Sequence, residues 1–229
     1  MVKALKKGTR FEHPLYRAYH ALYDAWGAQH WWPADTPLEM MVGAILTQNT
    51  AWTNVEKAIA RLKEADALSL ERLHRASLSR LAGWIRPSGY FNLKARRLRA
   101  LTGMIFERYD GRLERLLAEP PDRLREVLLG VWGIGPETAD SILLYAAGHA
   151  VFVVDTYTRR IVRRHGWLRG DESYDDVSAA FTSQIPSDPG FYGEFHALIV
   201  RAGKYHCRPR PDCASCPLRF LLPPNGPRD

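Results

Sequence analysis

The sequence has little cysteine and no long apolar run. Its 229 residues include three cysteines, all between positions 207 and 216, and such an odd, clustered set is unlike the disulfide framework of a secreted protein. The longest weakly polar run, residues 141–154, contains His149 and is shorter than the roughly 18–20 residues that span a bilayer. The opening MVKALKKGTRFEHP has no apolar signal core. We therefore expect a cytoplasmic protein, associated with the nucleoid if the source is a prokaryote.

Period-two alternation, internal repeats and low-complexity tracts are also missing, which argues against a sheet, a solenoid and a disordered chain. Apolar residues instead recur at helical spacing, and this pattern predicts an all-α protein. Asp122 is the expected N-cap of the helix that follows it. The predicted helices cover residues 38–46, 55–62, 70–81, 95–105, 122–129, 136–148 and 192–205, with a further helix that begins near Thr156.

Basic residues exceed acidic ones. Thirty-two lysines and arginines against 25 aspartates and glutamates give a formal net charge of +7. This excess is compatible with a polyanionic partner such as nucleic acid, and equally with an ordinary basic protein. The length allows one domain or two small ones.

A glycine-rich segment, WGIGPE at residues 132–137, lies between two predicted helices. Two glycines one residue apart allow a tight turn that brings backbone N–H groups close to an anion. The N-terminus of the following helix adds a positive partial charge aimed the same way, so the turn suits a DNA phosphate. The alternative is a helix–helix turn whose glycines supply only positive φ.

A carboxylate ends an apolar run in VVDT, residues 153–156, and leads into a basic helix. Taken locally, Asp155 is an N-cap, because aspartate is among the best residues at that position. A functional interpretation needs this segment and the glycine-rich segment together.

Four motifs in this order resemble those of the helix-hairpin-helix (HhH-GPD) DNA glycosylases of the endonuclease III type. They are LTQNT (46–50), IRPSGYFNLKA (85–95), the hairpin GIGPETA (133–139) with VVDT, and the Cys-rich tail. The resemblance covers about residues 37–217. It implies two helical domains that flank a DNA-binding groove. One is a six-helix barrel with the hairpin at 37–147, and the other is made of 1–36 and 148–229 and carries the Cys-rich loop.

The resemblance implies base excision repair on double-stranded DNA that contains a damaged base or an abasic site, and we expect the protein to be a monomer. In this family a damaged nucleotide is rotated out of the duplex into a protein pocket. Gly133, Ile134 and Gly135 would hold the phosphate backbone. Asp155 would stabilise the positive charge that grows on the sugar as the glycosidic bond breaks.

Further side chains match the DNA-contacting positions of the family. Gln48 and Tyr90 match positions that fill the gap left in the base stack, and an aromatic wedge suits unstacking. The alternatives are a buried polar cap for Gln48 and a core tyrosine for Tyr90. Basic residues that would neutralise phosphates, unless they belong to ordinary solvated helix faces, are Lys94, Arg96, Arg97, Arg159, Arg163, Arg201 and Lys204.

One position departs from the members that also have AP lyase activity. Those members carry a hairpin lysine 18 residues before the aspartate, which forms a Schiff base, and here 155 − 18 = 137 is a glutamate. Because a carboxylate forms no imine, we expect a monofunctional glycosylase with lyase activity absent or weak. Glu137 is then an acid that suits the helix dipole or a second catalytic carboxylate. The alternatives are a lyase that uses Lys94 or Lys204, and a catalytically silent DNA or abasic-site binder.

The motif segments LTQNTAWTNVEKAI and GIGPETADSILLYA are closer to the 3-methyladenine branch of the family than to the oxidised-pyrimidine branch. An aromatic pocket would favour a cationic alkylated purine through cation–π contact. Trp26, Trp52 and Trp132 are the candidate walls, although each also suits a core. The sequence leaves the lesion open.

The tail spaces its cysteines as Cys207-x5-Cys213-x2-Cys216, which resembles the loop that holds a [4Fe-4S] cluster on four thiolates in many family members. The fourth position holds Leu222. Three alternatives stay open: a cluster on three cysteines and another ligand, a metal-free loop, and zinc on three cysteines and a histidine such as His206. The arginines that this loop would present to a phosphate backbone are Arg208, Arg210 and Arg219.

Overall fold

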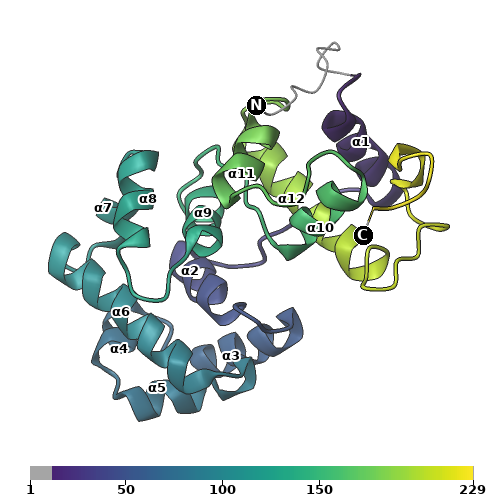
Figure 1. Cartoon of the computed structure of the whole chain (residues 1–229). Helices are drawn as coiled ribbons and strands as arrows, with labels where there is room; N and C mark the ends of the chain where they lie inside the picture. Colours follow the sequence, from purple (N-terminus) through teal and green to yellow (C-terminus); the bar gives the residue numbers. More distant parts are fainter. Residues whose placement is uncertain (1–11, 229) are drawn as a thin grey trace. The chain divides into compact units, whose positions relative to one another are not determined.

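The structure is a computed structural model that describes residues 12–228 (Figure 1). Within these residues, the secondary structure consists of α-helices and 3-10 turns joined by turns and loops, with no strand. This confirms the all-α prediction. None of the described helices is long and apolar enough to cross a membrane. The α-helices are α1 (Pro14–Trp26), α2 (Pro37–Leu46), α3 (Trp52–Glu64), α4 (Leu70–Arg75), α5 (Leu78–Trp84), α6 (Phe91–Tyr109), α7 (Leu113–Leu117), α8 (Pro121–Leu129), α9 (Pro136–Tyr145), α10 (Thr156–Arg164), α11 (Tyr174–Thr182) and α12 (Pro189–Tyr205), and the 3-10 turns are η2 (Arg86–Ser88) and η3 (Arg219–Leu221).

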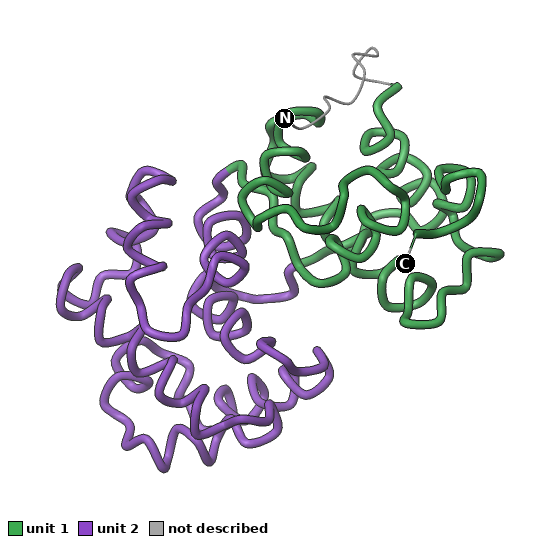
Figure 2. The backbone as a smooth tube through the Cα atoms, in the orientation of Figure 1, with its two compact units in different colours: residues 1–31, 150–229 green, residues 32–149 purple. Residues whose placement is uncertain are grey.

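The chain divides into two compact units (Figure 2). Unit 2, drawn in purple, is Trp32–His149, and unit 1, drawn in green, combines Met1–Trp31 with Ala150–Asp229. Unit 2 therefore contains α2–α9, whereas α1, α10–α12 and the Cys-rich loop belong to unit 1.

Helix α2 forms the centre of unit 2. Every residue of Leu38–Leu46 is buried, as expected for a helix that is apolar on all sides, and α2 packs against α3, α6 and α9. Thr36 caps its N-terminus, because its hydroxyl accepts a hydrogen bond from the Glu39 N–H at 3.1 Å. The loop after α2 carries the LTQNT motif, and the loop before α6 carries the SGY motif.

The structure differs from the sequence prediction at some helix ends. The helix expected over 70–81 is two helices, because Ala76 is extended and the Ser77 hydroxyl caps α5. Asp122 is not an N-cap: Pro120 holds that position of α8, and Asp122 lies in the first turn, where an acid also suits the helix dipole. Helices α1, α7 and α11 were not among the helices predicted from the sequence.

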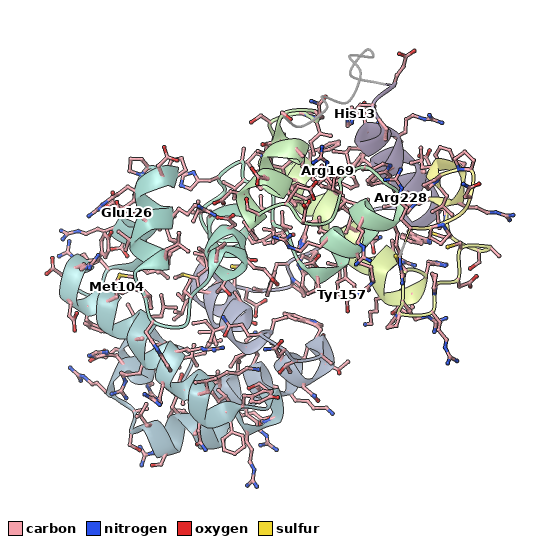
Figure 3. The ribbon with its side chains drawn as sticks, viewed as in Figure 1. His13, Met104, Glu126, Tyr157, Arg169 and Arg228 are labelled. Atoms are coloured by element: carbon pink, nitrogen blue, oxygen red, sulfur yellow. The ribbon has the colours of Figure 1, made fainter. Side chains whose placement is uncertain are left out.

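Unit 1 is built around the aromatic side chains of Phe152, Phe181, Tyr192 and Phe195, all fully buried. Helix α10 packs against α12, and both are seen in Figure 1. Tyr157 of α10, labelled in Figure 3, lies so close to Gly203 of α12 that a Cβ on Gly203 would collide with its side chain. This close packing fixes the position of the N-terminal end of α10 on α12.

Candidate functional site

The hairpin between α8 and α9 uses its two glycines differently. Gly133 has φ +86°, a left-handed conformation that favours glycine, and a Cβ there would collide with the side chain of Arg97. Gly135 has an ordinary φ of −99° and is the N-cap of α9. Gly135 is exposed, and a Cβ on it would meet nothing within 4 Å. Only Gly133 is therefore required by the turn itself, while Gly135 leaves the end of α9 open to approach from outside.

Ile134 points into the core. Its side chain is buried, and its N–H donates a hydrogen bond to the Val131 carbonyl at 3.0 Å. The prediction grouped Ile134 with the two glycines as a phosphate-binding residue. Its side chain instead anchors the turn, and its N–H already has a partner within the protein.

Gln48 is bound to the hairpin. Its Nε2 donates to the Gly133 carbonyl at 3.1 Å and to the Thr138 hydroxyl at 2.9 Å, and its Oε1 accepts a hydrogen bond from the Arg97 guanidinium. The side chain is therefore a half-buried polar cap in this structure. To enter a DNA base stack it would have to leave these three partners.

Tyr90 is exposed rather than part of the core. It is 69% accessible to solvent and has the left-handed angles φ 44° and ψ 30°, next to Gly89 with φ 64°. A left-handed non-glycine residue stores on the order of 1 kcal/mol of strain. The core alternative for Tyr90 is therefore wrong, and an exposed ring on a strained turn fits a wedge.

Lys94 is not on the surface. It is 1% exposed, and its Nζ donates to the Leu46 carbonyl (2.7 Å), the Thr50 hydroxyl (2.7 Å) and the Ser88 carbonyl (2.6 Å). Burial, together with the charge of Arg97, lowers the pKa of Lys94 to about 8. The predicted phosphate contact of Lys94 is wrong, because its position in α6 faces the inside of unit 2.

Other predicted basic residues take varied positions. In unit 2, Arg96 is exposed and lies 4.9 Å from the ring centre of Trp132. In unit 1, Arg201 lies 4.9 Å from the ring centre of Trp26 and donates to Gln29 at 3.2 Å. The exposed side chains among the predicted basic residues of unit 1 are Arg163, Lys204, Arg208, Arg210 and Arg219.

Asp155 begins α10 as its N-cap. Its Oδ1 accepts from the Thr158 N–H at 2.7 Å, and its Oδ2 lies 3.7 Å from Nε2 of His196 on α12. Burial alone would raise the pKa of this carboxyl, but His196 and the hydrogen bond from the Thr158 N–H outweigh burial and hold the pKa below its usual value. Asp155 is thus a buried carboxylate that is ionised at neutral pH, while also serving as the cap that its local sequence indicates.

His196 is the neighbour that the sequence analysis missed. It is buried within α12, in a run of apolar residues where a histidine carries no motif. Its importance depends on the packing of α10 against α12, which no local pattern reveals.

Glu137 is exposed in the first turn of α9. Its backbone carbonyl accepts a hydrogen bond from the Ser141 hydroxyl at 2.7 Å. An acid at this place stabilises the helix through the macrodipole, which is the simpler of the two predicted roles.

Unit 2 contains a cavity of about 200 Å³ with two tryptophan walls. The rings of Trp32 and Trp52 meet edge to face, with centroids 5.3 Å apart, and Trp52 Nε1 donates to Glu56 at 3.0 Å. Glu39 also lines the cavity, paired with Lys63 at 2.8 Å. Of the three predicted aromatic walls, Trp52 lines this cavity, and Trp32 was missed.

The other two tryptophans lie elsewhere. Trp26 is in unit 1, where it stacks on His206 with ring centroids 5.6 Å apart. Trp132 is half exposed beneath Arg96. Neither lines the cavity of Trp32 and Trp52.

The Cys-rich loop is tied to α10 by arginines. Arg164 donates to the carbonyls of Arg208 (2.6 Å) and Pro209 (3.1 Å), and Arg160 donates to the Cys207 carbonyl at 2.5 Å. These bonds hold the tail against α10.

The three thiols line one small cavity, of about 20 Å³, together with Leu222. Burial raises the pKa of Cys213 and Cys216. Among residues 12–228, no group of three or more His, Cys, Asp and Glu side chains is arranged to hold a metal ion. With leucine in the fourth place and room for about one water, this loop does not fit a [4Fe-4S] cluster on four protein thiolates.

Comparison with known proteins gives the family. The model of the HhH-GPD superfamily of base excision DNA repair proteins matches residues 42–187. The chain belongs to the HhH-GPD superfamily. The putative DNA repair glycosylase of Methanocaldococcus jannaschii is 44% identical to it, over 93% of this chain and 97% of the relative. Endonuclease III of Thermotoga maritima is 30% identical, over 80% and 81%.

Solved structures of HhH-GPD proteins share the fold. An endonuclease III–DNA complex matches with a TM-score of 0.79 at 26% identity, over 94% of this chain and 96% of that chain. The Helicobacter pylori 3-methyladenine DNA glycosylase bound to 1,N6-ethenoadenine matches with a TM-score of 0.72 at 32% identity, over 85% and 97%. The predicted family is confirmed, and the family indicates a DNA glycosylase.

Proposed function

We propose that this HhH-GPD protein is a monofunctional DNA glycosylase that hydrolyses the N-glycosidic bond of a base rotated out of double-stranded DNA. The observation that carries the proposal is the buried, ionised carboxylate of Asp155 in a chain whose lyase lysine position is Glu137. The Asp155 carboxylate supplies the negative charge that hydrolysis needs, whereas Glu137 lacks the amine that lyase chemistry needs.

The chemistry follows from the charge of the transition state. As the bond between base and sugar breaks, the deoxyribose becomes oxocarbenium-like, and a fixed carboxylate stabilises it most where water is excluded. The Thr158 N–H holds Oδ1 of Asp155 at 2.7 Å, and Oδ2 lies 3.7 Å from Nε2 of His196, so these two residues fix the orientation of the negative charge that acts on the sugar cation. Asp155 then orients or deprotonates the water that attacks the sugar carbon.

Lys94 is poorly placed to act as a substitute nucleophile. A Schiff base requires a free amine that reaches the sugar carbon. The Lys94 nitrogen is buried and already donates to three acceptors. This supports hydrolysis over the lyase alternative for the lysine nearest the DNA-contacting motifs.

The cavity of Trp32 and Trp52 supports an alkylated purine as substrate. Indole faces attract cations, and a 3-alkylated or 7-alkylated purine nucleoside carries a positive charge. Glu56 lines the same cavity and adds a negative charge that favours a cationic base, whereas the charge of Glu39 there is paired with Lys63 at 2.8 Å. A family neighbour at 32% identity is a 3-methyladenine DNA glycosylase, which points to the same class.

Phosphate binding is proposed for the open end of the hairpin. Gly135 is exposed with no side chain over it, and it precedes α9 without a side-chain cap. Backbone N–H groups at such a helix end bind a phosphate. Tyr90, exposed on unit 2, is proposed as the side chain that enters the base stack, with Gln48 joining it when released from the hairpin.

The proposed reaction takes no step through the Cys-rich loop. The cofactor prediction keeps three alternatives: a cluster on Cys207, Cys213 and Cys216 with an unidentified fourth ligand, zinc on these cysteines and a histidine such as His206, and a metal-free loop. Visible absorption and iron analysis of the purified protein check the cluster. A colourless, iron-free preparation with full excision activity excludes the cluster.

The test of the proposed function is an excision screen on duplexes that carry 3-methyladenine, thymine glycol, uracil or an abasic site, in a monomeric preparation. We expect release of the alkylated purine, intact abasic product, and no covalent adduct when borohydride is added to abasic DNA. A trapped adduct overturns the monofunctional proposal. Binding without release of any base favours the silent binder.

A further inference from the structure

Two surface loops of unit 2 carry the side chains proposed to enter the base stack. The Gln48 loop, residues 46–51, runs from the last residue of α2 to the start of α3, and the Tyr90 loop, residues 85–90, contains η2 and precedes α6. They lie far apart in sequence, and each must be held in a defined position for its side chain to meet the same gap in DNA. They are joined by the side chain of Lys94, one turn into α6, and by a hydrogen bond from Thr50 to Ser88.

We propose that Lys94 is a positioning residue that clamps the Gln48 loop to the Tyr90 loop and so sets both stack-filling side chains for insertion into DNA. This inference rests on the proposed function, because it takes Gln48 and Tyr90 as the inserting residues. It assigns to Lys94 a role without DNA contact.

The clamp is a set of three hydrogen bonds to both loops. Lys94 Nζ donates to the Leu46 carbonyl and the Thr50 hydroxyl on the Gln48 loop, and to the Ser88 carbonyl on the Tyr90 loop. The Thr50 hydroxyl itself donates to the Ser88 carbonyl at 2.5 Å. An ammonium has three donors and no acceptor, so this geometry uses all of them.

Charge is essential to this arrangement. A neutral amine has only two N–H donors and would turn its lone pair toward one of the three acceptors. The groups that face Lys94 from the Gln48 and Tyr90 loops are carbonyls and a hydroxyl, which do not titrate, and the charged group that acts on it is Arg97 in the next turn of α6. A buried charge whose only partners are neutral costs free energy. That cost indicates that the placement of the two loops matters for function.

Tyr90 shows why the placement needs a clamp. Its left-handed backbone is strained, and its ring gains nothing from the core because it is exposed. The backbone is fixed from one side by the Lys94 N–H, which donates to the Tyr90 carbonyl at 3.0 Å, and from the other by the clamp at Ser88. Without the clamp, the turn would relax and the ring would lose its direction.

The test is a double-mutant cycle on binding to a duplex with a tetrahydrofuran abasic-site analogue, using the full chain. Lys94→Met keeps the length of the side chain and removes the donors. Lys57→Met, an exposed lysine of α3, is the matched control. We expect Lys94→Met to weaken binding about tenfold and to reduce the fluorescence of a 2-aminopurine beside the site, but to cost less than about twofold in a Tyr90→Ala background.

The outcomes separate this inference from the proposed function. If Tyr90→Ala binds as the wild type does, the stack-filling role fails, and this inference falls with it. If Tyr90→Ala weakens binding but Lys94→Met does not, or if the two losses add in full, Lys94 does not act through Tyr90 and only this inference is overturned. Thr50→Val, which removes the hydroxyl bridge without touching a buried charge, gives the same readout if Lys94→Met does not fold.

A pH profile gives a readout that a purely structural role would not produce. Binding by the wild type is expected to weaken as pH rises through about 8, where Lys94 loses its proton, while Lys94→Met shows no such step. The clamp is contradicted if the binding profiles of the wild type and of Lys94→Met are parallel between about pH 7 and 9.5, the window around that pKa.

Discussion

Nε2 of His196 on α12 lies 3.7 Å from Oδ2 of Asp155 at the start of α10, and both residues are buried. The oxygen that Thr158 does not occupy is therefore the one that His196 faces. The pKa of Asp155 is low although the carboxyl is buried, because this neighbour and the cap bond outweigh desolvation.

Replacing His196 should shift the acid limb of excision. His196→Gln removes the coulombic influence of the imidazole that lowers the pKa of Asp155, while burial still raises it. The acid limb of the pH–rate profile, measured under single-turnover conditions, should move to higher pH. His20→Gln, an exposed histidine of α1, serves as control and should leave the limb in place. An unmoved limb in His196→Gln would show that the neighbour has no effect on Asp155.

Asp155 should also affect stability at low pH. Its pKa in the folded protein lies below the value of 3.8 for a free side chain, so it contributes stability that is present above that value and lost as pH falls through the folded-state pKa. Acid unfolding of the wild type followed by circular dichroism should therefore be steeper than that of Asp155→Asn at the acid end. Equal slopes for the two proteins would contradict a lowered pKa.

Lys94 should have the opposite pH sign for stability. Its pKa falls from 10.5 to about 8 on folding, so the unfolded chain binds the proton more tightly. The cost of the buried charge is full below pH 8 and is relieved as pH rises toward 10.5. As pH rises between these values, the free energy of unfolding in urea should increase less for Lys94→Met than for the wild type. DNA binding by the wild type should fall over the same range. A wild type that loses stability relative to Lys94→Met across this window would contradict the lowered pKa.

The two hairpin glycines should separate fold from DNA binding. Gly133→Ala is strained and collides with Arg97, so it should lower the free energy of unfolding by about 1–3 kcal/mol. Gly135→Ala has space for its Cβ and should cost less than about 1 kcal/mol, the loss typical of an N-cap. It should still weaken duplex binding, because the methyl group covers the helix end. Duplex binding by Gly135→Ala equal to that of the wild type would argue against phosphate contact there.

The tryptophan cavity should discriminate by charge. Trp52→Leu removes one aromatic wall, so excision of cationic 3-methyladenine should fall by about tenfold, in line with a cation–π contact of 1–2 kcal/mol, and excision of neutral hypoxanthine less. Trp26→Leu, from unit 1, is the control and should change neither. Equal losses on both bases in Trp52→Leu would point to packing rather than recognition.

The sequence was enough for the helical class and most helices, because their apolar spacing is local. It was also enough for the family, since the hairpin and VVDT stand in order at a fixed distance. At the hairpin, the sequence predicted the same role for both glycines. Only the packing of Arg97 shows that Gly133 alone is sterically required.

What the sequence could not give depends on contacts between distant segments. Lys94 has the same helical spacing as any phosphate-binding lysine, and only the return of α6 beneath two loops makes it internal. His196 and Trp32 lacked a motif and became relevant through packing against Asp155 and Trp52. The cap role of Asp155 was visible locally, but its burial was not.

The central claim is that the Asp155 carboxylate drives glycosidic hydrolysis, and the direct measurement is single-turnover excision of 3-methyladenine from duplex DNA by Asp155→Asn beside its affinity for the same duplex. Asparagine keeps the size and the capping ability of the side chain and removes the charge. The expected result is a loss of at least about a hundredfold in rate, the scale of losing a main electrostatic group, with affinity within about threefold of the wild type. An Asp155→Asn protein that releases the base at the wild-type rate would contradict the claim.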